Sequence, residues 1–275
     1  MLTVSDYRGR AFAKMQGLGN DFIVMNGCGE AREWTSEEAR RLCDRHFGIG
    51  ADGLIVLHEA ADSAADFSWQ FFNSDGSVAE MCGNGIRCVA AFLVGNGLIA
   101  PDQDRVAIQT GAGIVSIRVL RDESGSFEAA EVDMGRAVIT SESLTVAGTE
   151  LFCVSMGNPH AITFVADVEA APVTTLGPVI ECDAAFPDKT NVEFAQVTDR
   201  ATLRLRVWER GAGETLACGT GACATAVAAY RKGLCDARVT VRLPGGPLQI
   251  IIDPDTLNVM MTGPAQTVFI GSILL

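Results

Sequence analysis

Short apolar runs recur along the whole chain, and several of them alternate apolar with polar residues. Alternation of this kind is typical of half-buried strands, because successive side chains point to opposite faces of a sheet. The runs cover residues 22–25, 54–58, 67–72, 113–120, 151–156, 161–165, 201–209, 239–243 and 248–252. We therefore expect a protein built mainly from short strands.

Three segments carry a helical pattern instead. The first follows Thr35, which forms a capping box with Glu38, and we expect it to extend to about His46. The second begins near Gly83 and ends at the Gly-Asn-Gly of residues 95–97. Its apolar positions have the spacing of one helix face: Ile86, Val89, Ala90 and Leu93. The third begins near Gly219 and reads ACATAVAAY, which predicts a helix buried on every side.

Together these elements predict an α/β (α+β) protein in which strands wrap around a buried helix twice. The charged, turn-rich segment 121–131 lies near the middle of the chain and is the best candidate for a boundary. We expect a first domain of residues 1–125 with 266–275, and a second domain of residues 126–265.

A reactive arrangement occurs at the start of both buried helices. MCGNGIRC at 81–88 and ACGTGACA at 217–224 each place a cysteine before Gly-x-Gly. The two cysteines, Cys82 and Cys218, are separated by 136 residues.

Further polar residues repeat with the cysteines. Asn20 lies 62 residues before the first cysteine, and Asn158 lies 60 residues before the second. Asn73 and Glu209 each end a predicted strand nine residues before their cysteine. Three matching positions in the same order indicate two homologous halves, as a long-period repeat does in general.

The duplicated motif suits the inversion of a carbon centre. A free thiol has a pKa of about 8.5, and the N-terminus of a helix lowers it. Backbone N–H groups at a helix N-terminus bind carboxylates. In this chain the N–H groups are those of Gly83, Asn84, Gly219 and Thr220. Two such halves supply two thiols on opposite faces of one carbon, and the helix N-termini stabilise the charge that develops on the carboxylate. No cofactor and no metal are needed for this chemistry.

Composition narrows the class further. The 275 residues carry a net charge of −13 and no Lys/Arg-rich run, which argues against nucleic acid and membrane surfaces as partners. No apolar stretch approaches the ~18 residues of a membrane span, and the N-terminus has no apolar signal region. An odd number of cysteines, nine, without a dense framework indicates free thiols in a reducing cytoplasm. With three histidines, a structural zinc site is not expected.

Simpler interpretations exist for several of these residues. A free cysteine is usually a small core residue, and this interpretation holds for the seven cysteines outside the repeat. GIGADG at 48–53 matches a dinucleotide-binding pattern, but it follows a helical run rather than a strand. The asparagines could be turn formers, and His160 could be a satisfied polar residue of a turn.

Five segments together resemble the diaminopimelate epimerase family, in order along essentially the whole chain. They are MQGLGNDFIVMN, FFNSDGSVAEMCGNGIRC, GNPHA, NVEF and ERGAGETLACGTGACA. The resemblance implies two pseudo-symmetric α/β domains, each a mixed sheet around a central helix, with the active site in the cleft between them. It also implies a cofactor-independent, homodimeric enzyme that interconverts LL- and meso-2,6-diaminopimelate in lysine and peptidoglycan precursor synthesis.

The resemblance assigns roles to individual residues. Cys82 and Cys218 would be the acid/base pair, with His160 near the first thiol and Glu209 near the substrate amino groups and the second thiol. The side chains that would bind the substrate are Asn20, Asn73, Asn158, Asn191 and Arg210. Of these, Asn73, Asn191 and Arg210 would hold the distal amino-acid end, and an arginine suits a carboxylate because it binds as a bidentate fork. Some members have glutamine where this chain has Gly53, so no binding role is assigned there.

Two alternatives remain open. A related cofactor-free racemase of another amino acid would keep both cysteines and change the distal residues. A binding protein that closes on an amino acid without chemistry would show no exchange of substrate hydrogen with solvent.

Overall fold

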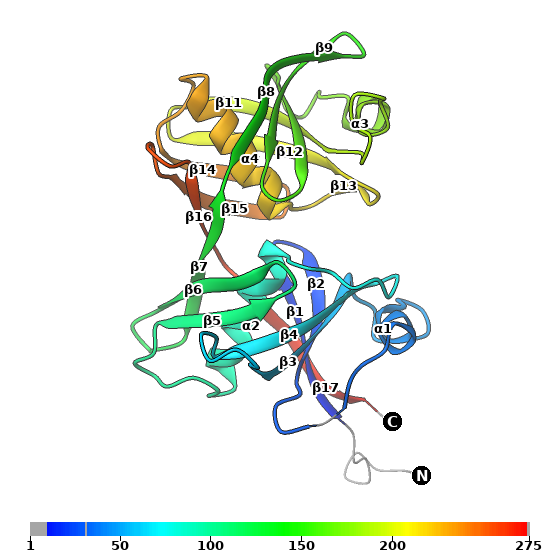
Figure 1. Ribbon diagram of the computed structural model, residues 1–275, viewed down its shortest axis with the longest axis vertical. Helices are drawn as coiled ribbons and strands as arrows, with labels where there is room; N and C mark the ends of the chain where they lie inside the picture. The colour runs from blue at the N-terminus through cyan, green and yellow to red at the C-terminus, as the bar shows by residue number, and fades with distance from the viewer. Residues whose placement is uncertain (1–9, 31, 274–275) are drawn as a thin grey trace. The chain divides into compact units, whose positions relative to one another are not determined.

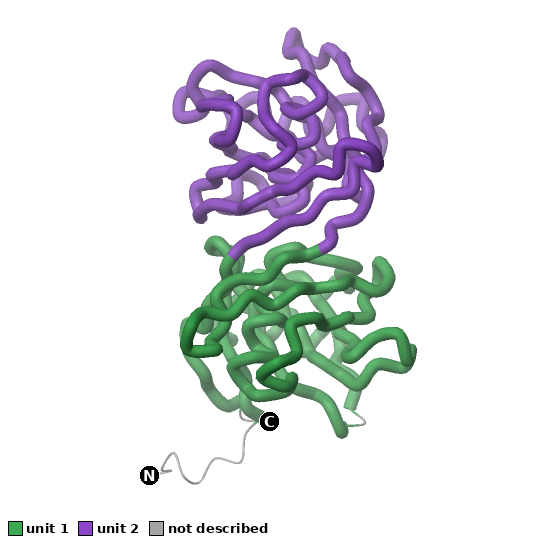
Figure 2. The backbone as a smooth tube through the Cα atoms, turned by 90° about the vertical axis from the view of Figure 1, so that its left-hand side faces the viewer, with its two compact units in different colours: residues 1–132, 264–275 green, residues 133–263 purple. Residues whose placement is uncertain are grey.

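The computed structural model describes residues 10–30 and 32–273. The chain divides into two compact units, shown in Figure 2. Unit 1 comprises Met1–Val132 and Pro264–Leu275, and unit 2 comprises Asp133–Gly263. The chain first passes from unit 1 to unit 2 inside strand β7 (Phe127–Arg136). The turn at residues 122–126, close to the boundary expected from the sequence, belongs to unit 1.

Unit 1 consists of strands around helix α2. Its other elements are β1 (Arg10–Gly17), β2 (Asn20–Asn26), α1 (Ser36–Cys43), β3 (Gly53–Glu59), β4 (Phe67–Asn73), β5 (Arg105–Thr110), β6 (Gly113–Arg121) and β17 (Gln266–Ile273), and α2 covers Gly83–Gly95. The strands β17, β1 and β2 pair antiparallel, and β2 pairs parallel to β3. The pairing then continues antiparallel to β4, parallel to β5 and antiparallel through β6 to β7.

Unit 2 repeats this topology around helix α4. Its elements are β8 (Val138–Val146), β9 (Thr149–Ser155), β10 (Pro159–Phe164), α3 (Val173–Glu181), β11 (Asn191–Asp199), β12 (Thr202–Glu209), β13 (Gly213–Thr215), α4 (Gly219–Arg231), β14 (Arg238–Leu243), β15 (Gly246–Ile252) and β16 (Asn258–Gly263). The strands β8, β9 and β10 pair antiparallel, and β10 pairs parallel to β11. The order continues antiparallel to β12, parallel to β14, and antiparallel through β15 to β16. The two halves that the sequence predicts therefore have one topology.

The central helices are buried as their sequences require. In α2 every residue from Gly83 to Leu93 is buried, and in α4 nearly every residue from Gly219 to Ala229 is. Helix α4 contacts strands on several sides, and Figure 1 shows it enclosed by the strands of unit 2. The first turn of each helix is therefore enclosed by the strands of its own unit.

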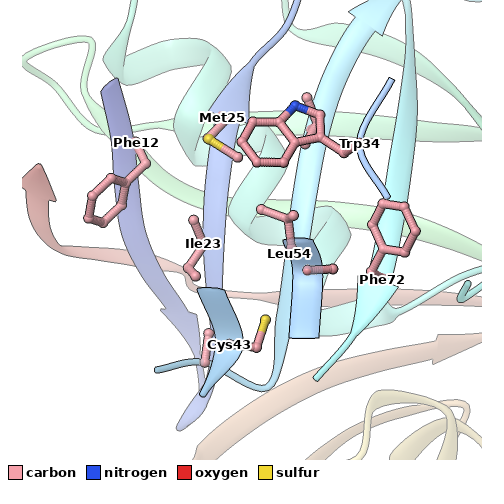
Figure 3. Close-up of a cluster of buried hydrophobic side chains, with 10 residues drawn as sticks. Phe12, Ile23, Met25, Trp34, Cys43, Leu54 and Phe72 are labelled. Atoms are coloured by element: carbon pink, nitrogen blue, oxygen red, sulfur yellow. The ribbon is translucent and has the colours of Figure 1, made fainter. Parts of the chain in front are cut away.

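The outer faces of the sheets are covered by the two shorter helices. In unit 1, Leu54 and Phe72 from the sheet pack with Trp34 and with Cys43 of α1, as Figure 3 shows. The predicted helix after Thr35 is present with its capping box, but it ends at Cys43. It ends early because the carboxylate of Asp44 accepts hydrogen bonds from the next turn's backbone and forms a loop there.

Helix α3 covers the corresponding face of unit 2 and was not predicted. Its segment contains Pro178 and Gly177, which weaken a helical pattern. The glycine is required by packing, because a Cβ at Gly177 would lie 2.6 Å from Cγ of Trp208. Among the described residues, no helix is long and apolar enough to cross a membrane.

Candidate active site

Each central helix begins with a cysteine as its N-cap. Cys82 has extended backbone angles (φ −147°, ψ 118°), and its sulfur accepts a hydrogen bond from the backbone N–H of Gly85 at 3.4 Å. Cys218 has the same arrangement (φ −125°, ψ 110°), with its sulfur 3.3 Å from the N–H of Gly221. The two sulfurs therefore occupy the position where an N-cap oxygen normally sits, beside the partial positive charge of a helix N-terminus.

Glycine permits this geometry. In α4, a Cβ at Gly221 would lie 2.8 Å from Oε1 of Glu193 and 3.2 Å from the sulfur of Cys218. In α2, a Cβ at Gly85 would lie 3.0 Å from the Cδ1 methyl of Ile55. The second glycine of each motif thus makes room for the side chains beneath the thiol.

In unit 1, Asn20 contacts the thiol. The thiol of Cys82 donates to Oδ1 of Asn20 at 3.8 Å, and Nδ2 of Asn84 donates to the same oxygen at 3.1 Å. On its other side, Nδ2 of Asn20 donates to Oδ2 of Asp52 at 2.8 Å. The Asp52 carboxylate therefore fixes the orientation of the Asn20 amide, with the carbonyl oxygen facing Cys82.

Charged groups anchor Asp52. Arg45 donates to Oδ1 of Asp52 at 2.7 Å and also to Asp21, and Lys14 forms a further ion pair with Asp21. Burial disfavours the charged form of Asp21, but hydrogen bonds from Arg45 and Lys14 outweigh it and hold the pKa at about 2. Asp21, behind Asn20, is therefore ionised at neutral pH.

Arg87 holds the beginning of α2 from below. This fully buried guanidinium donates to the carbonyl oxygen of Gly83 and to Oδ1 of Asn84, both at 2.9 Å. It also donates to the carbonyl oxygen of Pro264 at 3.1 Å, which ties the first turn of the helix to the returning C-terminal segment of the same unit.

In unit 2, a chain of hydrogen bonds leads to the second thiol. Glu193 and His160 are both buried, with Oε1 2.6 Å from the imidazole Nδ1. The imidazole Nε2 lies 3.0 Å from Oδ1 of Asn158, and Nδ2 of Asn158 donates to the hydroxyl of Thr220 at 3.3 Å. The Thr220 hydroxyl lies 3.5 Å from the sulfur of Cys218. Both ring nitrogens of His160 are thus occupied within unit 2.

Glu209 lies beside Cys218 and accepts a hydrogen bond from the hydroxyl of Thr215. Burial raises the pKa of the Glu209 carboxyl, and hydrogen bonds from Thr215 and Cys218 oppose this shift. Burial also raises the pKa of the Cys218 thiol well above its ordinary value, and the nearby carboxylates of Glu209 and Glu193 raise it further. Hydrogen bonds from the N–H of Gly221 at the helix N-terminus and from Thr220 lower this pKa, but burial and the two carboxylates outweigh them. These surroundings favour the protonated thiol of Cys218.

Asn191 and Arg210, which the resemblance assigns to the distal end of the substrate, lie together in unit 2. Oδ1 of Asn191 accepts from the backbone N–H of Arg210 at 2.9 Å, and its Nδ2 donates to the carbonyl oxygen of Pro159 at 2.9 Å. The exposed side chain of Arg210 donates from Nη1 to the carbonyl oxygen of Asp188 at 3.1 Å. Asn191 therefore holds the loop that presents Arg210, next in sequence to Glu209.

Asn73 belongs to unit 1, where it is the exposed last residue of β4. Its Nδ2 donates to the hydroxyl of Ser77 at 2.9 Å. Asn73 and Glu209 thus end the corresponding strands β4 and β12, in agreement with the repeat in the sequence.

Sequence reasoning missed three residues that support these sites. Glu193 lies within the buried first part of β11, residues 191–195. A carboxylate among the apolar residues of that segment was the signal that could have identified it. Arg87 is likewise the charged residue of an otherwise apolar or small helix. Asp52 had no signal beyond its place in the glycine-rich segment 48–53. Within residues 10–30 and 32–273, no three His, Cys, Asp or Glu side chains gather as a metal site would require.

Solved structures with the same fold define a class. One is a hydroxyproline epimerase from Agrobacterium vitis, with a TM-score of 0.73 and 16% identity over 98% of this chain and 93% of that one. Another is a PhzF-family phenazine biosynthesis protein from Bacillus anthracis, with a TM-score of 0.75 and 16% identity over 98% and 100% of the two chains. The protein thus has the two-unit α/β fold that these proteins share, and at such identities the likeness concerns the fold alone.

Sequence comparison identifies the family within this fold. The family model described as diaminopimelate epimerase matches residues 12–140 and 152–268. A diaminopimelate epimerase of Heliobacterium modesticaldum is 46% identical, covering 95% of this chain and 99% of its own length. One from Moorella thermoacetica is 48% identical, covering 94% and 98%. The chain belongs to the diaminopimelate epimerase family.

The charge around Cys218 leads to a prediction about its reactivity. Glu209→Gln removes a negative charge beside the sulfur, so the thiolate is less disfavoured and the pKa of Cys218 falls. At neutral pH, iodoacetamide should then alkylate Cys218 faster than in the wild type, as measured by mass spectrometry of the peptide across a pH series. The exposed Cys182 serves as an internal reference for the reagent. An alkylation profile of Cys218 that is unchanged, or shifted to higher pH, would contradict the prediction.

Proposed function

We propose that the protein interconverts LL- and meso-2,6-diaminopimelate without a cofactor, by a two-base mechanism that uses Cys82 and Cys218. The observation that carries this proposal is the cysteine N-cap found at the same place in two units of one topology, in a chain of the diaminopimelate epimerase family. Each unit supplies one thiol, and inversion needs one base and one acid on opposite faces of the α-carbon.

In each half-reaction one sulfur takes the α-proton and the other returns a proton. With its raised pKa, Cys218 enters the cycle as a thiol and protonates the carbon in the direction in which Cys82 takes the α-proton. In that direction the Cys82 thiol first releases its own proton to solvent, which leaves the thiolate as the base. In the reverse direction Cys218 must lose its proton first, and Glu209, which accepts a hydrogen bond from it, is the group that takes it. This step requires the two units to present their thiols to the same α-carbon.

The charge that develops on the substrate carboxylate needs stabilisation. The first turns of α2 and α4, at Gly83–Asn84 and Gly219–Thr220, present backbone N–H groups and the positive end of a buried helix. Preorganised donors of this kind act strongly in a site from which water is excluded. We propose that they replace the electron sink that a cofactor would provide.

The side chains at the strand ends would select diaminopimelate. Asn73, Asn191 and Arg210 are proposed to hold the distal amino-acid end, with the exposed guanidinium of Arg210 on its carboxylate. Asn20 and Asn158 would line the proximal end of the substrate. Asn20 contacts the Cys82 thiol, and Asn158 contacts Thr220, the neighbour of Cys218. His160 acts through Asn158, because both of its ring nitrogens are engaged.

The cellular setting is part of the proposal. All nine cysteines are free thiols, which suits a reducing cytoplasm, and the activity would belong to lysine and peptidoglycan precursor synthesis. We also propose a homodimer. Three consecutive apolar residues of β17 are strongly exposed, namely Val268 (59%), Phe269 (47%) and Ile270 (80%), and such a patch typically marks a contact surface.

The two-thiol mechanism predicts the fate of hydrogen. In D₂O with a chelator and no added cofactor, early product from LL-diaminopimelate should carry deuterium at the inverted centre, while recovered substrate carries little. Cys82→Ala and Cys218→Ala should each lose at least about 10²–10⁴-fold in kcat, the usual contribution of a general acid or base. Mass spectrometry and NMR of the amino acid give both results.

The matched control is Cys153→Ala, which alters a buried cysteine in the apolar cluster beneath α3. It should retain wild-type turnover. Substantial turnover by Cys82→Ala or Cys218→Ala would contradict the two-thiol mechanism. Activity that is lost on chelation and restored by a metal would contradict the proposal that no cofactor is needed.

The distal residues predict substrate choice. Lysine lacks the second carboxylate, so a site built to pair that group should leave Arg210 unsatisfied and reject lysine by about 10⁴-fold in kcat/KM. Arg210→Lys should fall well below the wild type with diaminopimelate, since an ammonium group does not form the planar fork. If lysine were racemised as well as LL-diaminopimelate, a racemase of broader specificity would replace this proposal.

The exposed strand predicts the oligomeric state. Wild-type protein should sediment at twice the chain mass of 29.0 kDa, and Ile270→Asp should shift it toward the monomer. Val138→Asp, which changes an exposed residue of unit 2 (55% exposed), is the control and should leave sedimentation unchanged. A dimer of undiminished stability in Ile270→Asp would place the interface elsewhere.

A further inference from the structure

The repeat shows which residues of the two units occupy equivalent places. Phe22 of β2 pairs with Gly53 of β3, and His160 of β10 pairs with Asn191 of β11. Phe22 lies two residues after Asn20, as His160 lies two residues after Asn158. Two residues further along the partner strands stand Ile55 in unit 1 and Glu193 in unit 2. These two side chains are therefore counterparts.

The two counterparts lie under the same glycine of the central helix. A Cβ at Gly85 would contact Cδ1 of Ile55 at 3.0 Å and Cζ of Phe22 at 3.7 Å. A Cβ at Gly221 would contact Oε1 of Glu193 at 2.8 Å. An apolar pair thus supports the first turn of α2, and an ionisable pair occupies the same place under the first turn of α4.

The ionisable pair is unfavourable for stability alone. Glu193 and His160 have fully buried side chains, and Oε2 of Glu193 has no hydrogen-bond partner among the described residues. Burying a carboxyl group with one oxygen unsatisfied costs free energy that the apolar pair of unit 1 avoids. A polar group retained at this cost calls for an explanation in the chemistry of the site.

Hydrogen-bond directions supply that explanation. Oδ1 of Asn158 only accepts, so the Nε2 of His160 that faces it must carry a hydrogen. Nδ2 of Asn158 donates to the Thr220 hydroxyl, which leaves that hydroxyl's own hydrogen to be donated to the sulfur of Cys218. The direction of the whole chain therefore depends on a proton at Nε2 of His160.

We propose that Glu193 is a positioning residue that, by sharing one proton with Nδ1 of His160, keeps Nε2 protonated and so keeps the Thr220 hydroxyl pointed at Cys218. The hydroxyl and the N–H of Gly221 then both donate to the sulfur when it acts as a thiolate. Glu193 touches neither the substrate nor the sulfur and acts through three intervening side chains. This role rests on the proposed function, in which Cys218 is one of the two bases.

The tautomer of His160 can be observed directly. The chain contains only three histidines, so ¹⁵N-histidine labelling gives resolvable ring signals, and His46 and His58 in unit 1 serve as internal references. In substrate-free wild-type protein near neutral pH, Nε2 of His160 should be protonated. An unprotonated Nε2 would overturn the proposal, whatever the activity of the protein.

Two variants separate the effect of hydrogen-bond direction from the effect of the Glu193 charge. In Glu193→Gln the amide N–H can donate to Nδ1, which keeps the hydrogen on Nε2, so kcat should stay within about tenfold of the wild type. Glu193→Ile installs the residue found in unit 1 and leaves Nδ1 without a partner. We expect Nε2 to lose its proton in part of the population and kcat to fall by about 10–100-fold, as when an orienting carboxylate behind a histidine is removed. KM should remain close to the wild-type value.

The outcomes are distinguishable. If kcat of Glu193→Gln falls by the ~10⁴-fold seen when an amide imposes the wrong histidine tautomer, the proposal fails. The negative charge of Glu193, and not the direction of the hydrogen bonds, would then be needed. It also fails if Glu193→Ile folds and has wild-type kcat. If Glu193→Ile does not fold, the ring signals of the wild type and of Glu193→Gln still decide. A wild-type protein that does not epimerise diaminopimelate would overturn the proposed function and leave the ring assignment standing.

Discussion

A cysteine sulfur caps each central helix, and the rest of the structure accommodates that contact. The cap requires extended backbone at the cysteine and an N–H three residues later that reaches the sulfur. Glycine suits that third position, because a Cβ there would lie 3.0 Å from Ile55 in one unit and 2.8 Å from Glu193 in the other. A sulfur held in this way is fixed relative to its helix, and burial of the helix on all sides fixes it relative to its sheet.

The two units share this cap but differ in what surrounds it. In unit 1 the apolar side chains of Ile55 and Phe22 lie beneath Gly85, and a neutral amide, Asn20, faces the Cys82 thiol. Around Cys218 two carboxyl groups are close enough to raise the pKa of the thiol. Duplication of a backbone therefore did not produce two equal thiols. A reaction that always needs one acid and one base can use this inequality, because burial and the neighbouring carboxylates favour the protonated form of Cys218.

Much of this could be predicted from local sequence. The N-caps, the glycines and the strand-end positions of Asn73 and Glu209 follow from residue types at fixed spacing, and both central helices begin where the pattern predicted. Other features depended on tertiary packing. Helix α3 contains Pro178 and a glycine whose reason is contact with Trp208, so its local pattern was misleading. The pKa of Cys218 depends on two carboxyl groups from different strands, one of which, Glu193, was not recognised.

The fold determines where the first turn of each central helix lies, but it does not determine the substrate. Proteins of this fold with 16% identity to the chain include a hydroxyproline epimerase and a phenazine biosynthesis protein. The backbone topology therefore places the first turn of a buried helix near the ends of two strands without selecting a substrate. At those ends the side chains, rather than the backbone, distinguish proteins of one fold. In unit 2 these are Glu209 and Arg210, held by Asn191 through the backbone N–H of Arg210. Because Asn191 binds the main chain of this loop, its carboxamide fixes the position of the Arg210 backbone.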